Sequence, residues 1–285
     1  MRRFTADYLE RTRRGMWESR EALAPLDLDD RCRILDVGCG TGELTRVLAE
    51  EAPDATVVGV DADTDLLAAA QDADPVADRD DRIAYCAGDA TRLPFPDDAF
   101  DLVVCQALLI NLPEPAAAVR EFARVSSELV AAVEPENADV EVTSTVDAEA
   151  SLEARVREAY IAGVETDVAM GDRVRAVFNE AGLSAVESRR YRHEKRVDPP
   201  YSEADLTDIT RKASGAGLAD HETELRRALD GDGESGNGDK GGNGDGYDEL
   251  RREWREMGRE AARQAQAREY ERVETVPFDV TVGRV

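Results

Sequence analysis

The chain has 285 residues, of which 42% are hydrophobic and 34% are charged, so it is long enough to form one large α/β domain with insertions. No apolar run approaches the roughly 20 residues of a membrane-spanning helix, which predicts a soluble protein without membrane contact. The 62 acidic and 36 basic residues leave a net charge of −26, and such a charge disfavours binding to nucleic acid at low salt.

The charged residues include few lysines, only Lys195, Lys212 and Lys240. At molar salt the Debye length falls to about 3 Å, so the self-repulsion of an acidic surface is screened and its charge favours solubility. We therefore expect an extreme halophile as the source. The N-terminal segment carries mixed charge where a secretory signal needs an apolar stretch, which predicts a cytoplasmic protein.

Helical spacing of apolar residues over residues 1–30 predicts an N-terminal helical cap. From Arg33 onward, short apolar runs such as ILDVG, TVVGVD and FDLVVCQA alternate with helical patterns. This alternation is typical of a parallel sheet with helices on both faces. We expect the core to span residues 31–197 and to be completed by the strand pattern of residues 273–285.

The region from 198 to 272 differs in composition and predicts a helical insertion. It begins at the Pro199-Pro200 break and contains a stretch, residues 231–246, with almost no apolar side chain. Such a stretch cannot offset its ordering entropy by burial, which predicts a disordered loop. A long helix rich in Arg, Glu and Ala is expected to follow it.

The glycine-rich segment ILDVGCGTG defines the kind of ligand. Gly38, Gly40 and Gly42 read GxGxG, whereas the dinucleotide fingerprint would need glycine where Glu43 stands, and no Lys-Ser or Lys-Thr pair follows to make a phosphate-binding loop. Asp36 precedes the glycines, and a carboxylate there can hold an ammonium group. We therefore expect a ligand with an amine and without a pyrophosphate.

Two further carboxylates stand at the ends of the next expected strands. Asp61 ends the second strand, where a carboxylate can accept hydrogen bonds from both hydroxyls of a ribose. Asp89 follows the third strand and can accept from an adenine amine, while the backbone N–H of Ala90 can donate to a ring nitrogen. Amine, ribose and adenine are the parts of S-adenosylmethionine.

Residues 33–125 resemble the class I S-adenosylmethionine-dependent methyltransferases of the UbiE/type-11 kind, on ILDVGCGTG, GVDADTDLL, GDATRLPFPDDAFDLVVCQALLINLPEP and AVREFARV in that order. Together with the alternation of elements, this resemblance predicts a Rossmann-like, mostly parallel seven-stranded sheet with an antiparallel last strand, N-terminal helices and helical insertions. It implies S-adenosyl-L-methionine as cofactor, held by Asp36, Gly38, Cys39, Gly40, Gly42, Asp61, Ala62, Asp89, Ala90 and Gln106.

The acceptor side is less defined, and the sequence names no catalytic residue. The chain lacks the proline-glycine-glycine turn that the family has before its fifth strand. Glu134 and Glu136, at the end of that strand, are candidates to face a substrate, with solvated loop acids as the alternative. Tyr8 and Trp17 of the N-terminal segment are candidates to cap the pocket.

Other motifs favour structural roles. The DPPY of residues 198–201 matches a motif of amino-directed DNA methyltransferases, but it follows a later strand than the fourth. The basic run of residues 189–196 is interpreted as an edge strand. His193 and His221 are expected to be exposed side chains, and Cys32, Cys39, Cys86 and Cys105 to be reduced and mostly buried; neither set predicts a metal site.

The sequence therefore predicts a methyltransferase acting on a small molecule. The alternatives are an RNA or protein methyltransferase, favoured if the basic run borders the cofactor, and a non-catalytic cofactor-binding partner subunit. Neither the acceptor nor the oligomeric state follows from the residues.

Overall fold

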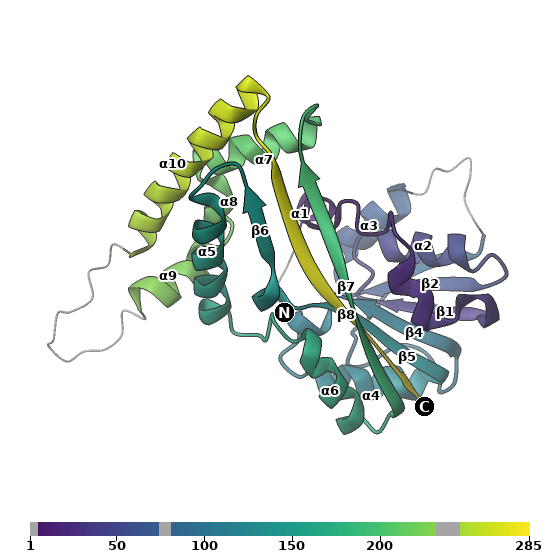
Figure 1. The fold of residues 1–285 in the computed structure, drawn as a ribbon. Coiled ribbons are helices and arrows are strands. Elements are labelled where there is room, and N and C mark those ends of the chain that lie inside the picture. Colours follow the sequence, from purple (N-terminus) through teal and green to yellow (C-terminus); the bar gives the residue numbers. More distant parts are fainter. Residues whose placement is uncertain (1–4, 74–80, 232–245) are drawn as a thin grey trace, which may run out of the picture. The chain divides into compact units, whose positions relative to one another are not determined.

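A computed structural model of the chain describes residues 5–73, 81–231 and 246–285 (Figure 1). The predicted disordered loop therefore lies outside the described residues, apart from its two end residues. The chain forms two compact units. The first, here called the sheet unit, comprises Met1–Glu136, Val168–His193 and Pro277–Val285, and the second, the helical unit, comprises Asn137–Asp167 and Glu194–Val276. Residues 137–167, assigned to the core in the sequence analysis, cluster with the helical unit.

The strands form a mixed sheet in the order β3-β2-β1-β4-β5-β8-β6, with β7 paired to β8. Strands β1 to β5 are parallel, and β8 runs antiparallel to β5 and β6. Their bounds are β1 (Arg33–Val37), β2 (Thr56–Asp61), β3 (Ile83–Ala87), β4 (Phe100–Gln106), β5 (Ser126–Pro135), β6 (Glu141–Ser144), β7 (Ser184–Val197) and β8 (Arg272–Arg284). The predicted Rossmann-like, mostly parallel fold with an antiparallel last strand is confirmed.

The described residues form eight strands, one more than predicted, and the added strand is β6. It is four residues long and pairs with residues 272–275 of β8 in the helical unit, while residues 278–284 of β8 pair with β5 in the sheet unit. A four-residue strand is too short to show a two-residue period clearly. Its extended conformation is stabilised by the partner strand, which lies far away in the sequence.

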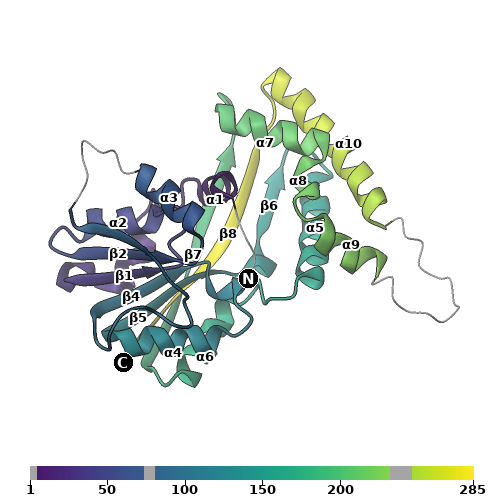
Figure 2. The same ribbon diagram turned by 180° about the vertical axis from the view of Figure 1, so that it is seen from behind.

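Helices cover both faces of β1 to β5, as Figure 1 and Figure 2 show for α2 and α3 on one side and α4 and α6 on the other. The alternation of β4 explains this: Leu102 and Val104 pack with α2, whereas Val103 and Cys105 pack with α4 and α6. The helices are α2 (Glu43–Glu51), α3 (Thr64–Ala73), α4 (Pro115–Val125) and α6 (Val174–Glu180), with 3₁₀ turns at Leu109–Asn111 and Gly171–Arg173.

The N-terminal segment forms one short helix, α1 (Ala6–Arg13), and two 3₁₀ turns, η1 (Glu21–Leu26) and η2 (Leu28–Asp30). Thr5 begins α1 as its N-cap, because its side chain accepts the N–H of Tyr8. Met16, Trp17 and Leu26 then pack on the α2 face of the sheet. The segment is therefore part of the core of the sheet unit.

The helical unit contains α5 (Glu149–Gly163), α7 (Glu203–Ser214), α8 (Ala216–Ala219), α9 (Glu222–Asp230), α10 (Gly246–Ala267) and β6, with a 3₁₀ turn at Asn137–Asp139. It also includes residues 194–197 of β7 and 272–276 of β8. Its core gathers Leu225, Tyr247, Leu250 and other apolar residues. Two glycines allow close helix crossings. A Cβ on Gly163 would lie 1.9 Å from the carbonyl oxygen of Glu224, and one on Gly258 would lie 2.4 Å from the nitrogen of Ala213.

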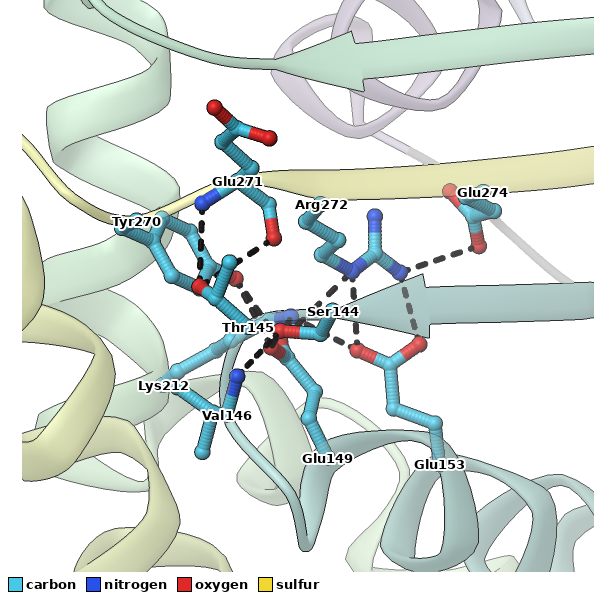
Figure 3. A network of polar contacts seen from close by, with 10 residues as sticks. All are labelled: Ser144, Thr145, Val146, Glu149, Glu153, Lys212, Tyr270, Glu271, Arg272 and Glu274. Carbon is cyan, nitrogen blue, oxygen red and sulfur yellow. Dashed lines mark hydrogen bonds and ion pairs between the residues drawn. The ribbon is translucent and has the colours of Figure 1, made fainter.

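A buried ionic network joins α5, α7 and β8 within the helical unit (Figure 3). Glu149 and Glu153 both bind Lys212, Arg272 binds Glu153 at 2.6 Å, and the hydroxyl of Tyr270 donates to Glu149 at 2.8 Å. Burial opposes ionisation of Glu153, but Lys212 and Arg272 outweigh it and lower its pKa. Two carboxylates and two cations thus compensate each other where water is excluded. Within the described residues, no helix is both long and apolar enough to cross a membrane.

Candidate cofactor site

The turn after β1 needs glycines for its backbone conformation, and most of its backbone N–H groups form hydrogen bonds within the protein. Gly38, Gly40 and Gly42 have φ angles of 71°, 56° and 74°, which side chains with a Cβ rarely adopt. The N–H groups of Gly38 and Cys39 donate to the carbonyl of Val60, at 2.7 and 3.1 Å, and that of Gly42 donates to Cys39 at 2.9 Å. The turn is thus bound to the end of β2.

Asp61, the last residue of β2, completes this turn. Its Oδ2 accepts the N–H of Gly40 and its Oδ1 accepts the N–H of Asp63, both at 2.8 Å. A carboxylate has about four lone-pair sites, so each oxygen still has room for one more donor. Asp61 is 8% exposed. It can therefore hold the turn and accept two ribose hydroxyls, whereas Ala62 beside it is exposed.

Asp36 lies deeper, under the first turn of α2. It is 1% exposed, and its Oδ2 accepts the hydroxyl of Thr45 at 2.6 Å. Burial raises its pKa to about 6, against the bonds from Thr45 and the positive charge of Arg13. A cationic group placed near this carboxylate would favour its ionised form.

The third carboxylate, Asp89, is exposed after β3. Its Oδ1 accepts both the N–H and the hydroxyl of Thr91, each at 2.8 Å, and these bonds lower its pKa. Because both use Oδ1, the second oxygen stays available for another donor such as an exocyclic amine. Ala90 follows it and is nearly buried, at 9% exposure.

Gln106 ends β4 and lies against the N-terminal segment. It is 2% exposed, its amide nitrogen donates to the sulfur of Met16, and its Oε1 is buried without a partner among the described residues. Ala107 next to it has a φ of 48°, an uncommon conformation for a residue other than glycine. Trp17, a candidate substrate contact, is a 4% exposed core residue, while Tyr8 is half-buried.

Two expected site residues are positioned by packing. The sulfur of Cys39 lies 3.0 Å from where a Cβ on Gly59 would stand, so this side chain points into the sheet and only its backbone belongs to the turn. Burial raises the pKa of its thiol. Cys105 is also buried, Cys86 is half-buried and Cys32 is exposed, and all four are free thiols.

The interpretation of Glu134 and Glu136 as solvated loop acids is wrong, whereas their role as substrate contacts stays a prediction. Glu134 has no exposed surface and Glu136 is 6% exposed. Glu134 accepts the backbone N–H groups of Leu108, Leu109 and Ile110 at 3.0, 2.9 and 3.4 Å. It therefore fixes the loop after β4. Burial raises its pKa to about 7, although these bonds oppose the shift.

The remaining motifs are DPPY, the basic run and the two histidines. DPPY follows β7 in the helical unit, not β4. In the basic run, Arg190 binds Asp279 and Asp172 at 2.8 Å. His193 and His221 are half-buried, not exposed, and the described part of the chain holds no cluster of three metal-ligating side chains.

Sequence reasoning missed three residues that shape the site: Thr45, Leu108 and Arg13. Thr45 follows Asp36 by nine positions, on the face of α2 that a helical period would have turned toward β1. Leu108 lies 2.8 Å from where a Cβ on Gly38 would stand. Arg13 lies beside Gly40. Only Thr45 could have been found from the sequence pattern, because the contacts of Leu108 and Arg13 depend on tertiary structure.

The donors and acceptors fit an adenosine with an amino acid tail better than a dinucleotide. Four of the five amides from residue 38 to 42 donate within the turn, to β2 or to Asp61. They are not free to bind a pyrophosphate, in contrast to an anion-binding glycine loop. Carboxylates at the carboxyl ends of β1, β2 and β3 instead provide acceptors for an amine and for hydroxyls.

Known proteins that are similar in sequence to this chain are methyltransferases. Residues 35–128 match the family model described as a methyltransferase domain. An uncharacterised methyltransferase of Schizosaccharomyces pombe is 37% identical over 33% of this chain and 36% of its own length. A demethylmenaquinone methyltransferase of Lactiplantibacillus plantarum is 38% identical over 37% and 45%, and a trans-aconitate 2-methyltransferase of Azoarcus is 35% identical over 40% and 41%. The matches thus cover less than half of these relatives.

The fold has a match over nearly the whole chain. The crystal structure of the YcgJ protein of Bacillus subtilis is 18% identical, covers 93% of this chain and 98% of its own, and has a TM-score of 0.52. At this identity the likeness concerns the fold alone. The family model and the sequence relatives agree, and residues 35–128 form a methyltransferase domain of the class I, S-adenosylmethionine-dependent family.

Proposed function

We propose that the chain transfers a methyl group from S-adenosyl-L-methionine to a small-molecule acceptor. The observation that carries this proposal is Asp61. Its carboxylate is fixed by the N–H groups of Gly40 and Asp63 and retains lone pairs for a ribose. Asp89, with one oxygen available, would accept from the adenine amine, and the backbone N–H of Ala90 would donate to the ring. Asp36 would stabilise the ammonium group.

The cofactor, when bound, supplies a methyl group already activated by its sulfonium. The chain then has to bind, align and exclude water. The Glu134 carboxylate holds residues 108–110 at the edge of the site, and Gln106 presents a buried amide oxygen. We assign no general base, because an activated methyl donor needs none when the acceptor is a sufficiently strong nucleophile.

The relatives favour a small acceptor over a macromolecule. The relatives whose names give a substrate include a demethylmenaquinone methyltransferase, a 27-O-demethylrifamycin SV methyltransferase and a trans-aconitate 2-methyltransferase. The basic run, which would favour RNA, is partly neutralised: the guanidinium of Arg190 is bidentate on Asp279 and also binds Asp172. The net charge of −26 adds to the repulsion of a polyanion.

Labelling in molar KCl tests the proposal. The protein is incubated with methyl-labelled cofactor and a cell extract divided into small molecules, RNA and protein. Label in the small-molecule fraction supports the proposal. Label confined to RNA or protein contradicts the acceptor class, and cofactor binding without label in any fraction contradicts catalysis.

A matched pair of variants tests the cofactor site itself. Asp61→Asn should weaken cofactor binding by about tenfold or more, since charged hydrogen bonds contribute roughly 1.5–3 kcal/mol. Asp101→Asn is the control, because Asp101 also accepts two backbone amides, from Cys32 and Arg33, but at the amino end of β1. Calorimetric titration with S-adenosylhomocysteine measures both. Equal losses in the two variants would show that only folding was affected.

A further inference from the structure

Helix α1 lies directly on the glycine turn of the sheet unit. A Cβ on Gly40 would stand 3.0 Å from Cδ1 of Leu9 and 3.6 Å from Nη1 of Arg13. Leu9 is 6% exposed, and Arg13 is half-buried. The helix thus brings one apolar side chain and one guanidinium to the middle of the turn.

Arg13 differs from the other arginines near this turn, because it makes no hydrogen bond or ion pair with the described residues. Arg11 lies over the ring of Tyr8 at 5.7 Å, and Arg46 donates to the carbonyl of Thr41 at 3.0 Å. Arg13 therefore affects its neighbours only through the electrostatic effect of its positive charge. Burial raises the pKa of Glu43, and Arg13 opposes that rise as it does for Asp36.

The proposed ligand has a carboxylate that could accept hydrogen bonds from the guanidinium of Arg13. The amino acid tail of the proposed cofactor carries a carboxylate as well as an ammonium. Asp36 and Asp61 repel a carboxylate, and most of the turn amides are already donated within the fold. A guanidinium binds a carboxylate through two parallel N–H bonds. Arg13 lies beside Gly40, and its N–H groups form no hydrogen bonds with the described residues.

We propose that Arg13 binds the carboxylate of the methionine moiety of the cofactor, so that α1 closes over the glycine turn with Leu9 as its apolar contact. This inference rests on the proposed cofactor. It assigns the N-terminal segment a part in cofactor binding that is separate from any contact with the methyl acceptor.

The test compares two ligands that differ in the tail. S-adenosylhomocysteine has the amino acid tail, and 5′-methylthioadenosine shares its adenosine and thioether but lacks both the ammonium and the carboxylate of the tail. Arg13→Gln should weaken binding of the first by about 10- to 100-fold, the range for removing a charged hydrogen-bonding partner, and change the second by less than twofold. Calorimetric titration at fixed KCl measures both.

Arg11→Gln is the matched control, since it removes the same charge from the same helix and should leave both affinities unchanged. Arg13→Lys should recover only part of the loss, because a lysine cannot make the two parallel bonds. Equal weakening of both ligands by Arg13→Gln, or no weakening of either, overturns the inference. Failure of the unmodified protein to bind either ligand would overturn the proposed function and this inference with it.

Discussion

Replacing Glu134 by glutamine changes the charge of a fully buried group while keeping one of its oxygens. The oxygen that accepts from Leu108 and Leu109 can be retained, and the new amide nitrogen replaces the oxygen at 3.4 Å from the N–H of Ile110. Glutamine therefore resembles the neutral form of the native side chain. The variant separates the cost of charge from the benefit of the loop contacts.

The expected change in the free energy of unfolding follows from the pKa of Glu134, which burial raises from 4.5 to about 7. Because the folded state binds this proton more tightly than the unfolded chain, the stabilisation is complete below about pH 4.5 and is lost as the pH rises to about 7. At about 1.36 kcal/mol per pKa unit, this amounts to roughly 3 kcal/mol. Between pH 4.5 and 8, we expect the stability of Glu134→Gln to rise by this amount relative to the native chain.

Chemical denaturation at fixed KCl, repeated across this pH range, measures the difference in free energy of unfolding. Other groups with raised pKa values, such as Asp36, are common to both proteins and cancel. Glu134→Ala is the companion variant: it removes the acceptor from three buried N–H groups and should be less stable at every pH. A difference between the glutamine variant and the native chain that stays flat from pH 4.5 to 8 would refute the reasoning.

Three other predictions concern stability. Lys212→Met leaves Glu149 and Glu153 short of a cation and should cost about 3–5 kcal/mol in the helical unit, measured by denaturant unfolding; a loss below 1 kcal/mol would contradict the role of the network. Gly258→Ala should destabilise by about 1–3 kcal/mol because its Cβ meets the backbone of α7, whereas Gly217→Ala, with open space around it, should be neutral or stabilising in the same assay. Finally, the melting temperature should rise between dilute buffer and molar KCl, since screening relieves the repulsion of a net charge of −26; an unchanged value would count against a halophilic protein.

The local parts of the site could be predicted from the sequence because their partners are near in the chain or follow from strand order. The spacing of Gly38, Gly40 and Gly42 reflects the positive φ angles of a tight turn. Asp61 was placed at the end of a strand by the apolar run before it. Parallel strands bring their carboxyl ends to one edge, so that edge could be located without coordinates.

The features that the sequence did not predict depend on contacts between segments that are distant in the chain. Glu134 meets its three amides across about 25 positions, so the sequence around it shows only an acid at the end of a strand. Its full burial is enforced by the loop that folds over it. Likewise, nothing in residues 5–13 indicates that Leu9 and Arg13 lie on Gly40, and β6 became a strand only because β8 extends beyond β5.

The structure also sharpens why this turn selects its ligand. A phosphate-binding loop leaves its amides free to point at the anion, whereas here the amides of Gly38, Cys39 and Gly40 are donated to β2. The ligand is therefore expected to be bound by the side chains around the turn and not by the backbone N–H groups of the turn. Asp61 is central to this arrangement, since one carboxylate both orders the turn and keeps lone pairs for a ligand. The turn is ordered by contacts within the chain itself, so less conformational entropy is lost on binding.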